Sequence, residues 1–550
     1  MQPWDTIVIG SGAGGLTAAV ALARAGQKVL VLEQHYLPGG WCQSFSLQGY
    51  RFSPGVHYIG ECGPGGAMRR VWEGLGIGPD LELCELNPDG YDHLLIEGER
   101  FDIPRGYDRY FARLVERFPH EREGLTRYFD TLRRLHREVL ACDAMLSFPR
   151  VLALPFKSPT LLYWGFRTHG ALLDATIKDR RLRAVLAAQS GDHGLAPSRV
   201  SLPLHASLIA HYQNGAFYPR GGGGRIPMAL IKALRRRGGK IRLRSEVSRI
   251  LVEKGRAAGV ELASGERIRA RAVIANADPA VTFGELLPAE HGRRERRRLA
   301  RTEYSVSLMS VFCAVDLDLA AMGYDSGNYW FYRTADVNAL YERLEKSLPD
   351  RAIDGLFLTI TTLKDPGRKP HKHHTLELFT FVPHAPFAIY GDAEQGARGA
   401  AYERLKEGLG DQMIAAAEEV IPGLSRAIRF RSVGSPVTND YYCATPRGAA
   451  YGTAKTPFQV GPFSFAIRTS VRGLYSCGAS TVSHGVAGAS MSGLMAAQAV
   501  LGVKSMAELL GPPDGSLRVY PADHPEEWLA GAARVDRAPE EEAAELESPA

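Results

Sequence analysis

Hydrophobic and polar positions change their spacing along this 550-residue chain, and the opening segment shows the change most clearly. Thr6–Ile9 is β-branched and apolar, Gly10–Gly15 is dense in glycine, Leu16–Ala25 is rich in alanine, and Lys28–Leu32 is apolar again. This order predicts a strand, a tight turn, a helix and a second strand. The chain therefore starts with a compact βαβ unit.

Short strands separated by turn residues are predicted for the middle of the chain. Turns are indicated at Lys254-Gly255 and at Ser264-Gly265. The apolar segments around these turns are Val247–Val252, Ala257–Leu262, Ile268–Ala270 and Val273–Ala275. Together they predict a β-meander.

Three other regions differ in pattern from these strands. From about 105 to 190 the apolar residues recur at the spacing of a helix, charged residues are frequent, and prolines interrupt the pattern. This indicates an inserted helical segment. From about 300 to 435, apolar strands such as Leu356–Thr361 and Leu376–Val382 alternate with helices, which suits a substrate-binding sheet. After about 535 the chain is rich in Ala, Glu and Pro, with too few apolar residues to offset the entropy of ordering, so we expect disorder there.

The composition is that of an ordinary globular enzyme. Hydrophobic residues make up 45% and charged residues 23% of the chain, which argues against a fibrous, disordered or polytopic membrane protein. The seven cysteines are widely spaced, without a C-x-x-C pair or a His/Cys metal spacing, so we expect reduced thiols and no metal.

The formal net charge is +6, and basic residues cluster at Arg235–Arg237 and Arg293–Arg298. Solvated helix faces are the favoured interpretation of such clusters. Nucleic acid is not an expected partner, because interleaved aromatic residues and a recognised binding motif are both missing. An anionic membrane surface stays open as an alternative partner.

The turn after the first strand has the glycine spacing of a dinucleotide-binding site. Gly10, Gly12 and Gly15 fill the positions of G-x-G-x-x-G, between a predicted strand and a predicted helix. They permit the tight turn, the approach of backbone to a pyrophosphate, and close packing of helix on strand. The phosphates would lie at the helix N-terminus, which favours anions. Glu33 ends the next strand and can accept hydrogen bonds from the ribose hydroxyls of an adenosine, but would repel the 2′-phosphate of NADP.

Later segments indicate FAD rather than NAD. Glu33–Gly40 (EQHYLPGG) places a double glycine beyond the acidic residue and resembles flavoproteins of the glutathione-reductase type, which bind an extended FAD. In that class a segment similar to Gly473–Ser480 binds the ribityl chain, and a helix similar to the one opened by Gly485–Gly488 points its N-terminus at the flavin N1–C2=O edge. A positive helix end stabilises the negative charge of reduced flavin there. The chain departs from this class at Ala479. Many of these flavoproteins have an acidic residue at this position, directly after the turn glycine, and it binds the ribityl hydroxyls.

This resemblance implies FAD as the cofactor and an α/β fold, with a Rossmann-type FAD-binding domain interleaved with an α+β substrate domain. Two domains are also expected because a single core stops growing at roughly 250–300 residues. The predicted FAD contacts are Gly10, Ser11, Gly12, Ala13, Gly14, Gly15, Glu33, Gln34, Gly39, Gly40, Val247, Gly478, Ala479, Ser480, Val486 and Gly488. The predicted segments are 1–100, 215–300 and 470–510 for the FAD domain, 101–214 for a helical insertion facing substrate or membrane, 301–469 for the substrate domain, and 535–550 for a disordered tail.

Four further motifs resemble the retinol saturase family, in the same order across nearly the whole chain. They are Gly55–Gly60 (GVHYIG), Phe217–Gly222 (FYPRGG), Ser435–Asn439 (SPVTN) and Thr445–Gly452 (TPRGAAYG). Retinol saturases belong with carotenoid isomerases and phytoene desaturases among flavoproteins that act on polyenes. The resemblance implies an FAD-dependent oxidoreductase acting on carbon–carbon double bonds of an apolar polyene, with saturation as the first expectation. The leader of the vertebrate members is missing here, which predicts a cytoplasmic location, either free or peripheral at the inner face of the membrane.

Three residues of these motifs are candidates for catalysis. His57 and Tyr58 either line the FAD pocket as satisfied polar groups or supply a proton to the substrate. Arg220 either pairs with a carboxylate or frames the flavin edge, where Gly221 and Gly222 allow a close approach of backbone. The sequence does not decide between these alternatives.

The stretch Leu146–Phe166 is apolar, aromatic and interrupted by basic residues. These interruptions make it unfit to span a bilayer. Docking on a membrane surface and packing as an internal helical cap are both open interpretations.

Rival functions remain for the whole chain. Desaturation would run the same geometry in reverse, and cis–trans isomerisation would involve no net redox change. A non-enzymatic alternative is a prenyl-binding protein similar to GDP-dissociation inhibitors and Rab escort proteins, against which the intact glycine turn and Glu33 argue. A yellow colour of the purified protein would exclude that alternative. The sequence contains no second nucleotide motif, so it assigns no electron donor or acceptor.

Overall fold

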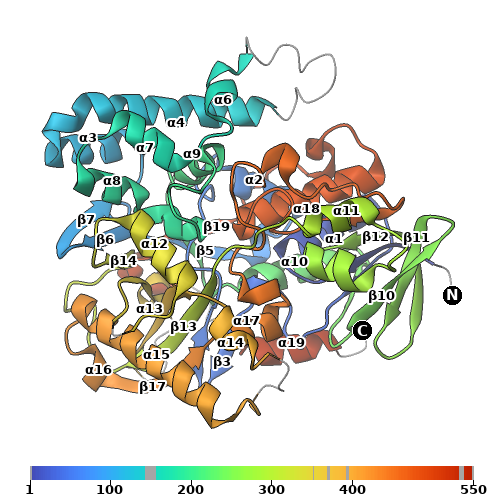
Figure 1. Ribbon diagram of the computed structural model, residues 1–550. Coiled ribbons are helices and arrows are strands. Elements are labelled where there is room, and N and C mark those ends of the chain that lie inside the picture. The colour runs from blue at the N-terminus through green and yellow to red at the C-terminus, as the bar shows by residue number, and fades with distance from the viewer. Residues whose placement is uncertain are drawn as a thin grey trace.

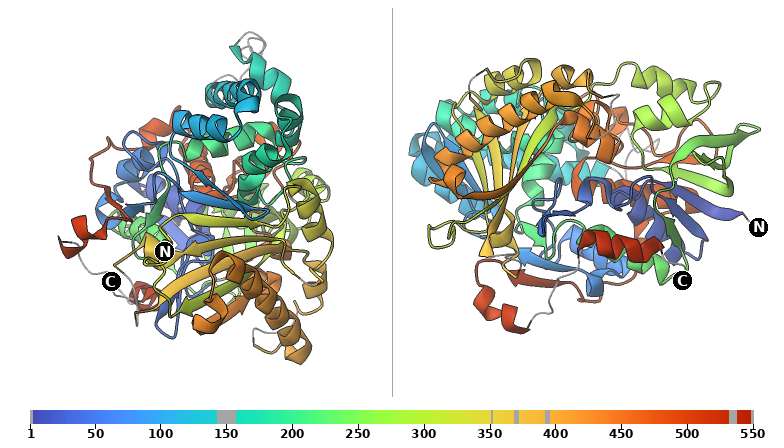
Figure 2. Two further views of the ribbon diagram at one scale, coloured as in Figure 1. Left: turned by 90° about the vertical axis from the view of Figure 1, so that its left-hand side faces the viewer. Right: turned by 90° about the horizontal axis from the view of Figure 1, so that it is seen from below.

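Two large sheets and a layer of helices make up the molecule in the computed structural model (Figure 1). The structure describes residues 3–142, 157–350, 352–367, 372–391, 396–531 and 538–547. The first sheet contains the N-terminal strand. The second sheet lies beside it, with helices on both of its faces (Figure 2).

The first sheet combines a parallel core with the predicted meander. Its strands, in spatial order, are β10 (Val247–Glu253), β11 (Arg256–Leu262), β12 (Arg267–Ala275), β1 (Trp4–Ile9), β2 (Val29–Leu32) and β9 (Lys240–Arg242), with β18 (Leu474–Ser476) paired to β12. β12, β1, β2, β9 and β18 pair in parallel, and β10 and β11 are antiparallel. The apolar segments predicted at Ile268–Ala270 and Val273–Ala275 form one strand, β12.

Helices pack closely on this sheet because small residues lie at their contacts. The helices are α1 (Ala13–Arg24), α2 (Ala67–Leu75), α10 (Arg225–Arg235) and α18 (Gly485–Leu501). A Cβ atom at Gly493 of α18 would lie 2.1 Å from the carbonyl oxygen of Gly14 in α1. The two helices whose N-termini adjoin the predicted cofactor segments therefore cross with backbone against backbone.

The second sheet has two apolar faces. Its strands, in spatial order, are β17 (Ile428–Gly434), β13 (Ser307–Val315), β16 (His374–Val382), β15 (Gly355–Ile360), β14 (Asn328–Tyr332), β6 (Asp92–Ile96) and β7 (Glu99–Ile103). Among the described strands of this sheet, β14 and β6 pair in parallel and the other neighbours pair antiparallel. Tyr329 and Leu358 pack with residues of α15 (Gly399–Val420), whereas Trp330 and Phe357, one position along each strand, lie on the opposite face.

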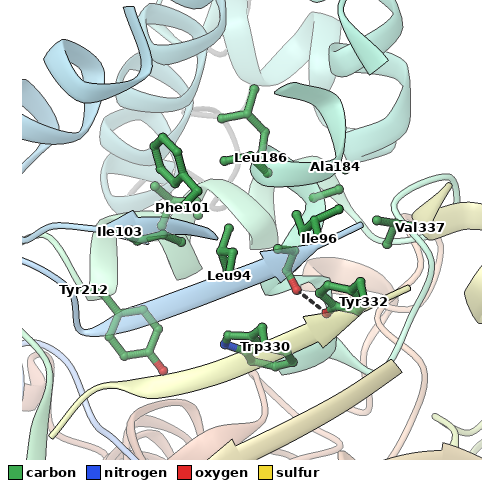
Figure 3. Close-up of a cluster of buried hydrophobic side chains, with 14 of the residues drawn as sticks. Leu94, Ile96, Phe101, Ile103, Ala184, Leu186, Tyr212, Trp330, Tyr332 and Val337 are labelled. Atoms are coloured by element: carbon green, nitrogen blue, oxygen red, sulfur yellow. Dashed lines mark hydrogen bonds between the residues drawn. The ribbon is translucent and has the colours of Figure 1, made fainter. Parts of the chain in front are cut away.

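A layer of helices covers part of that opposite face (Figure 1). The helices are α3 (Tyr107–Arg117), α4 (Arg122–Cys142), α6 (Pro159–Trp164), α7 (His169–Thr176), α8 (Arg180–Ala187) and α9 (Leu202–His211). Figure 3 shows Ala184 and Leu186 of this layer above Leu94 and Ile96 of β6, with Tyr332 of β14 beside them. A short 3₁₀ turn, Ala188–His193, continues from α8.

Smaller elements complete the fold. A three-stranded sheet joins β19 (Arg518–Pro521), β5 (Glu82–Glu85) and β8 (Phe217–Pro219), and a hairpin joins β3 (Phe45–Leu47) to β4 (Tyr50–Phe52). The other helices are α11 (Arg293–Leu299), α12 (Val337–Lys346), α13 (Thr361–Lys364), α14 (Ala385–Ala388), α16 (Leu424–Ala427), α17 (Pro436–Cys443) and α19 (Pro539–Glu547).

The structure corrects two boundaries expected from the sequence. The first FAD segment was expected to extend to residue 100, but β6 and β7 belong to the second sheet because β6 pairs with β14 across 236 positions of sequence. The tail 535–550 was expected to be disordered, but its residues 539–547 form α19. Ala543 and Leu546 of this helix are buried in the hydrophobic core that also contains residues of the first sheet and of α1 and α10. Two apolar side chains are therefore enough to hold this segment against the rest of the molecule.

Candidate functional site

One cavity runs from the glycine turn of the first sheet to the aromatic face of the second sheet. It encloses about 2110 Å³ of space not occupied by atoms, including the part open to solvent. Residues of both sheets line it, so a cofactor at the glycine turn and a substrate at the aromatic face would lie in one continuous site. Its first end lies where β1, β2 and β12 terminate, which is the edge at which open parallel sheets bind ligands.

The glycine turn leaves a cradle that side chains would fill. Gly10 has a φ of +90°, and a Cβ at Gly12 would lie 2.8 Å from Nδ2 of Asn276. Gly12 is the N-cap of α1 and provides no side-chain cap, so the N–H groups of the first turn are available to an anion. A Cβ at Gly15 would lie 2.3 Å from the carbonyl oxygen of Gly10, which explains the third glycine.

Glu33 organises the turn from the end of β2. Its carboxylate is buried and accepts hydrogen bonds from the Ser11 amide at 2.8 Å, the Ser11 hydroxyl at 2.6 Å and the His35 amide at 2.9 Å. The Ser11 hydroxyl in turn accepts a bond from the Gly39 amide at 3.0 Å. The acidic residue and the double glycine, both singled out in the sequence, are thus held in one network beside the cavity.

The C-terminal segment reaches the same cavity from the other side. β18 ends at Ser476, Gly478 follows with a φ of +104°, and α18 begins at Gly485. The Ser480 hydroxyl donates to Asp278 at 2.9 Å, and Lys455 Nζ donates to the Ala479 carbonyl at 2.7 Å. Gly485, Val486 and Ala489 from the start of α18 line the cavity, so the positive end of this helix adjoins it.

The far end of the cavity is aromatic and apolar. β14, β15 and β16 present alternate residues to it because side chains of a strand point to opposite faces in turn. The lining residues from this wall and from α12 are Trp330, Tyr332, Leu340, Tyr341, Leu344, Phe357, Phe379 and Phe381. Such a wall suits a long apolar molecule that offers few polar atoms.

His57 and Tyr58 lie at the junction of the two ends. The His57 ring packs on Phe379 and Phe357, with centroid distances of 4.6 and 5.3 Å, and its Nδ1 lies 3.3 Å from Glu377 Oε2. Burial lowers the pKa of His57, against the raising effect of Glu377, so the ring is neutral near pH 7. Burial also raises the pKa of Tyr58 well above its ordinary value, so the phenol keeps its proton.

A buried charge network lies behind these two residues. Lys364 Nζ donates to the His57 carbonyl at 2.7 Å and to the side chain of Asn328. Asn328 Nδ2 donates to Asp92 Oδ1 at 3.0 Å. Burial lowers the pKa of Lys364 to about 7, while the charges of Glu377 and Asp92 oppose this shift. The network fixes the backbone of the Gly55–Gly60 motif.

The structure places Arg220 away from the cavity lining, which corrects the catalytic role considered for it. Arg220 is 4% exposed, its Nη1 lies 2.6 Å from Glu82 Oε2, and its guanidinium lies over the Trp528 ring at 5.4 Å. The alternative of pairing with a carboxylate is the one observed. Gly221 and Gly222 line a small separate pocket rather than the large cavity.

Most of the predicted FAD contacts line the large cavity. Those that do are Gly10, Ser11, Gly12, Ala13, Gly14, Glu33, Gln34, Gly39, Gly40, Val247, Gly478, Ala479, Ser480 and Val486. Gly15 and Gly488 are outside the lining. A Cβ at Gly488 would lie 2.6 Å from Ser483, so both of these glycines allow tight packing instead.

Several lining residues lie outside the motifs recognised in the sequence. Asn276, Ala277 and Asp278 follow β12, and their position after a buried parallel strand could have revealed them. Asp192 lies in the turn after α8, far from every motif, and its sequence context contains no comparable signal.

The arrangement fits a dinucleotide with its adenosine at Glu33, its phosphates at the start of α1 and its reactive end near the start of α18. The fit is shown by the cradle at Gly12 and by the acceptor atoms of Glu33. The aromatic wall then faces the reactive end across His57 and Tyr58. This geometry would bring the reactive end of a bound dinucleotide next to an apolar molecule on the aromatic wall.

Comparisons with known proteins agree with this geometry. Residues 13–501 match the family described as flavin containing amine oxidoreductase. The chain is 30% identical over 526 residues to the all-trans-retinol 13,14-reductase of Danio rerio, covering 90% of this chain and 86% of that protein. It is 29% identical over 519 residues to the chloroplastic prolycopene isomerase of Arabidopsis thaliana, covering 90% and 82%.

Solved structures show the same fold. A putrescine oxidase bound to putrescine superimposes with a TM-score of 0.61 at 15% identity, over 91% of this chain and 100% of that chain. An oxidoreductase from Methanosarcina mazei gives a TM-score of 0.59 at 20% identity, over 91% and 100%. The chain therefore has the α/β fold of flavin amine oxidases.

Proposed function

The chain belongs to the flavin-containing amine oxidoreductase family, and from this premise we propose that it binds FAD and reduces a carbon–carbon double bond of an apolar polyene. The single observation that carries the proposal is the continuous cavity, which joins the glycine turn and Glu33 to a wall of aromatic side chains. Polyenes have long apolar surfaces that an aromatic wall can cover. The retinol reductase and prolycopene isomerase relatives act, by their names, on such molecules.

In this proposal the two helix N-termini and Glu33 hold the cofactor. Bound FAD would supply a hydride at N5, which is the chemistry that saturation of a double bond needs. Glu33 would accept bonds from the ribose hydroxyls, and the start of α1 would take the pyrophosphate. The start of α18 would stabilise negative charge on the reduced ring system.

The chain's own contribution is alignment of the substrate and exclusion of water. The rings of Trp330, Phe357 and Phe379 would hold a polyene in one orientation against the cofactor. The entropy lost in orienting the two reactants would then be lost on binding rather than in the reaction step. His57 and Tyr58 lie where this substrate and the cofactor would meet, and we propose that they form the catalytic wall there.

A Glu33→Ala variant is expected to retain FAD more weakly than the unmodified protein. The variant removes a charge-assisted acceptor worth about 1.5–3 kcal/mol, which corresponds to roughly 10-fold to 100-fold in the dissociation constant. Equilibrium dialysis of the released flavin measures this constant. Glu266→Ala is the control, because Glu266 forms an exposed ion pair with Arg242 outside the cavity. Equal FAD affinity in both variants would contradict the role of Glu33.

Saturation can be distinguished from its rivals by analysing the isoprenoid lipids of a host strain with and without the gene. Saturation adds two hydrogen atoms to the polyene, desaturation removes two, and isomerisation leaves the mass unchanged. We expect the first result. Isomerisation is the second candidate, because a prolycopene isomerase is among the relatives of similar identity.

We also propose that the protein docks on an anionic membrane through an exposed aromatic patch. The patch consists of Leu162, Tyr163, Phe166, Phe458 and Phe463. The Phe166 ring lies 6.0 Å from Phe458 and 5.9 Å from Phe463, so two distant segments form one surface.

A basic group adjoins this aromatic patch, as docking on anionic lipid requires. The Arg167 guanidinium lies over the Tyr163 ring at 4.1 Å. In the described part of the chain, none of the helices has the length and apolar character needed to cross a bilayer, so docking at the surface is the proposed mode.

The predicted docking stretch Leu146–Phe166 needs revision. Its residues 146–156 lie outside the described part of the chain. Leu161 and Trp164 pack against the hydrophobic core between the second sheet and its layer of helices. This side of α6 therefore fits the alternative of an internal cap. The exposed side of α6, with Leu162 and Tyr163, is the part left for docking.

Replacing Phe166, Phe458 and Phe463 together by Ser is expected to abolish co-sedimentation with phosphatidylserine-containing liposomes while FAD stays bound. The aromatic side chains contribute apolar binding energy that salt does not screen, whereas salt weakens the attraction between the basic groups and anionic lipid. Salt alone should therefore release the protein only in part. Ile389→Ser is the matched control, since Ile389 is 80% exposed and lies after α14. Unchanged sedimentation of the triple variant would refute docking through this patch.

A further inference from the structure

A tight turn brings one acidic side chain into the cavity. Asp192 lies in the 3₁₀ turn Ala188–His193, between Gly191 and Gly194. A Cβ at Gly191 would lie 2.2 Å from the Trp330 ring, and a Cβ at Gly194 would lie 2.9 Å from the Tyr451 ring. The turn is therefore wedged between two aromatic walls of the cavity, which fixes the position of Asp192.

Hydrogen bonds connect this turn to both ends of the cavity. Tyr58 Oη donates to Asp192 Oδ2 at 2.8 Å, and the Tyr332 hydroxyl donates to the Ala188 carbonyl at 2.7 Å. His484, which precedes α18, lines the same part of the cavity, and its ring lies 5.4 Å from the ring of His193, the residue after Asp192. Asp192 thus lies between the helix end assigned to the cofactor and the aromatic wall assigned to the substrate.

A second carboxyl group lies close behind the first. Tyr58 Oη is 3.3 Å from Asp92 Oδ2, compared with 2.8 Å from Asp192. Asp92 is fully buried and accepts bonds from Asn328 Nδ2 at 3.0 Å and from Gln189 Nε2 at 2.9 Å. Asn328 also receives the bond from Lys364, so a cation is linked to Asp92 through one amide.

These contacts make the two acids unequal. Asp92 has two amide donors and the linked Lys364, which favour its ionised form. Among the residues that the structure describes, Tyr58 is the side chain that donates to the Asp192 carboxyl group. Two carboxyl groups that share one hydroxyl repel each other when both are charged, so one of them holds a proton. The contacts assign that proton to Asp192.

Burial and the charge of Asp92 act in the same direction on the pKa of Asp192, which is raised well above its ordinary range. Burial raises the pKa of Asp92 to about 6, against the lowering effect of its amide donors. The titratable groups facing Asp192 from the surrounding elements are Asp92, His484, Tyr58, Tyr91, Tyr212, Tyr332, Tyr341 and Tyr451. Of these groups, Asp92 alone is charged near pH 7, because burial lowers the pKa of His484 and raises those of the tyrosines.

We propose that Asp192 is the acid that protonates the polyene, and that Tyr58 positions its carboxyl group. The inference rests on the proposed function and deepens it by naming the proton donor. One carbon of the double bond receives a hydride from the reduced cofactor, and its neighbour receives the proton of Asp192. The C=C π bond is lost, two C–H bonds form, the cofactor is oxidised by two electrons, and Asp192 is left as a carboxylate that regains a proton from water.

The protonation state can be tested without turnover. The infrared difference spectrum between the unmodified protein and Asp192→Asn at pH 7 is expected to contain the C=O band of a protonated carboxylic acid, shifted in ²H₂O. The corresponding difference for Asp92→Asn is expected to contain carboxylate bands instead. A protonated band in the Asp92 difference, and none in the Asp192 difference, would overturn the assignment.

The catalytic role is tested by the anaerobic reoxidation of dithionite-reduced holoenzyme on mixing with all-trans-retinol in detergent micelles. We expect Asp192→Asn to slow this step about 10²–10⁴-fold, the usual contribution of a general acid, with FAD content unchanged. In Asp92→Asn the alkaline limb of the pH profile should move to lower pH. Loss of the neighbouring negative charge lowers the pKa of Asp192, so its acid form disappears at lower pH.

Each outcome of this experiment separates the two proposals. Equal rates for the unmodified protein and Asp192→Asn would overturn the role of Asp192 and leave the proposed function standing. Absence of reoxidation of the unmodified protein by all-trans-retinol and by a carotenoid in the same micelles would overturn both. If Asp192→Asn fails to fold, the Asp92→Asn profile decides, because an unmoved alkaline limb is incompatible with Asp192 as the acid.

Discussion

A Gly14→Val variant is expected to be purified without FAD. A Cβ at position 14 would lie 2.7 Å from Asn276 Oδ1 and 2.8 Å from the carbonyl oxygen of Ala489. The second contact is with the backbone of α18, which cannot move away as a flexible side chain can. Overpacking of this kind typically costs about 1–3 kcal/mol, occasionally more, and here it would separate the two helices whose N-termini are assigned to the cofactor.

The measurement for this variant is the ratio of flavin to protein absorbance after purification, together with thermal unfolding. Gly408→Val is the control, because Gly408 is an exposed helical residue of α15 and a Cβ there would meet nothing within 4 Å. Valine destabilises the interior of a helix less than glycine does, so the control should be at least as stable toward unfolding as the unmodified protein. Normal flavin content in Gly14→Val would contradict the assigned cofactor position.

Tyr58→Phe is expected to slow the reoxidation of reduced flavin by all-trans-retinol about 10²-fold, with FAD still bound. The phenol donates to Asp192 at 2.8 Å, and that bond strengthens when Asp192 becomes a carboxylate. Hydrogen bonds to charged groups contribute about 1.5–3 kcal/mol, and loss of positioning adds to this cost. Anaerobic stopped-flow absorbance of the flavin measures the rate.

His57→Asn serves as the comparison for this variant. Its ring packs on Phe357 and Phe379 and is neutral near pH 7, while Lys364 is bonded to the backbone carbonyl, which the substitution keeps. We therefore expect a change of only a few-fold. A large loss in His57→Asn with a normal rate in Tyr58→Phe would transfer the proton role to His57.

Local chemistry made the cofactor end of the site predictable from the sequence. Gly10 follows a β-branched strand and has a φ of +90°, and a Cβ at Gly15 would lie 2.3 Å from the carbonyl oxygen of Gly10, so both requirements arise within a few residues of sequence. Glu33 follows the next apolar strand, so its place at the same sheet edge follows from parallel pairing. These features depend on short stretches of sequence.

The substrate end depends on contacts between distant segments. Asp192 meets Tyr58 across 134 positions, and Lys364 meets the His57 carbonyl across 307 positions. Strand β6 pairs in parallel with β14, which is also distant in sequence, and β7 pairs with β6. Residues 92–103 therefore belong to the second sheet and not to the cofactor domain expected for them. Periodicity and composition do not specify such pairings, because many combinations of strands would bury comparable apolar area.

The most direct test of the account is a single turnover of dithionite-reduced enzyme with all-trans-retinol under anaerobic conditions. The flavin spectrum and the mass of the recovered retinoid are followed together. We expect the flavin to be reoxidised as the retinoid gains two hydrogen atoms. A flavin that stays reduced while the retinoid keeps its mass, with or without a change of double-bond geometry, would contradict it.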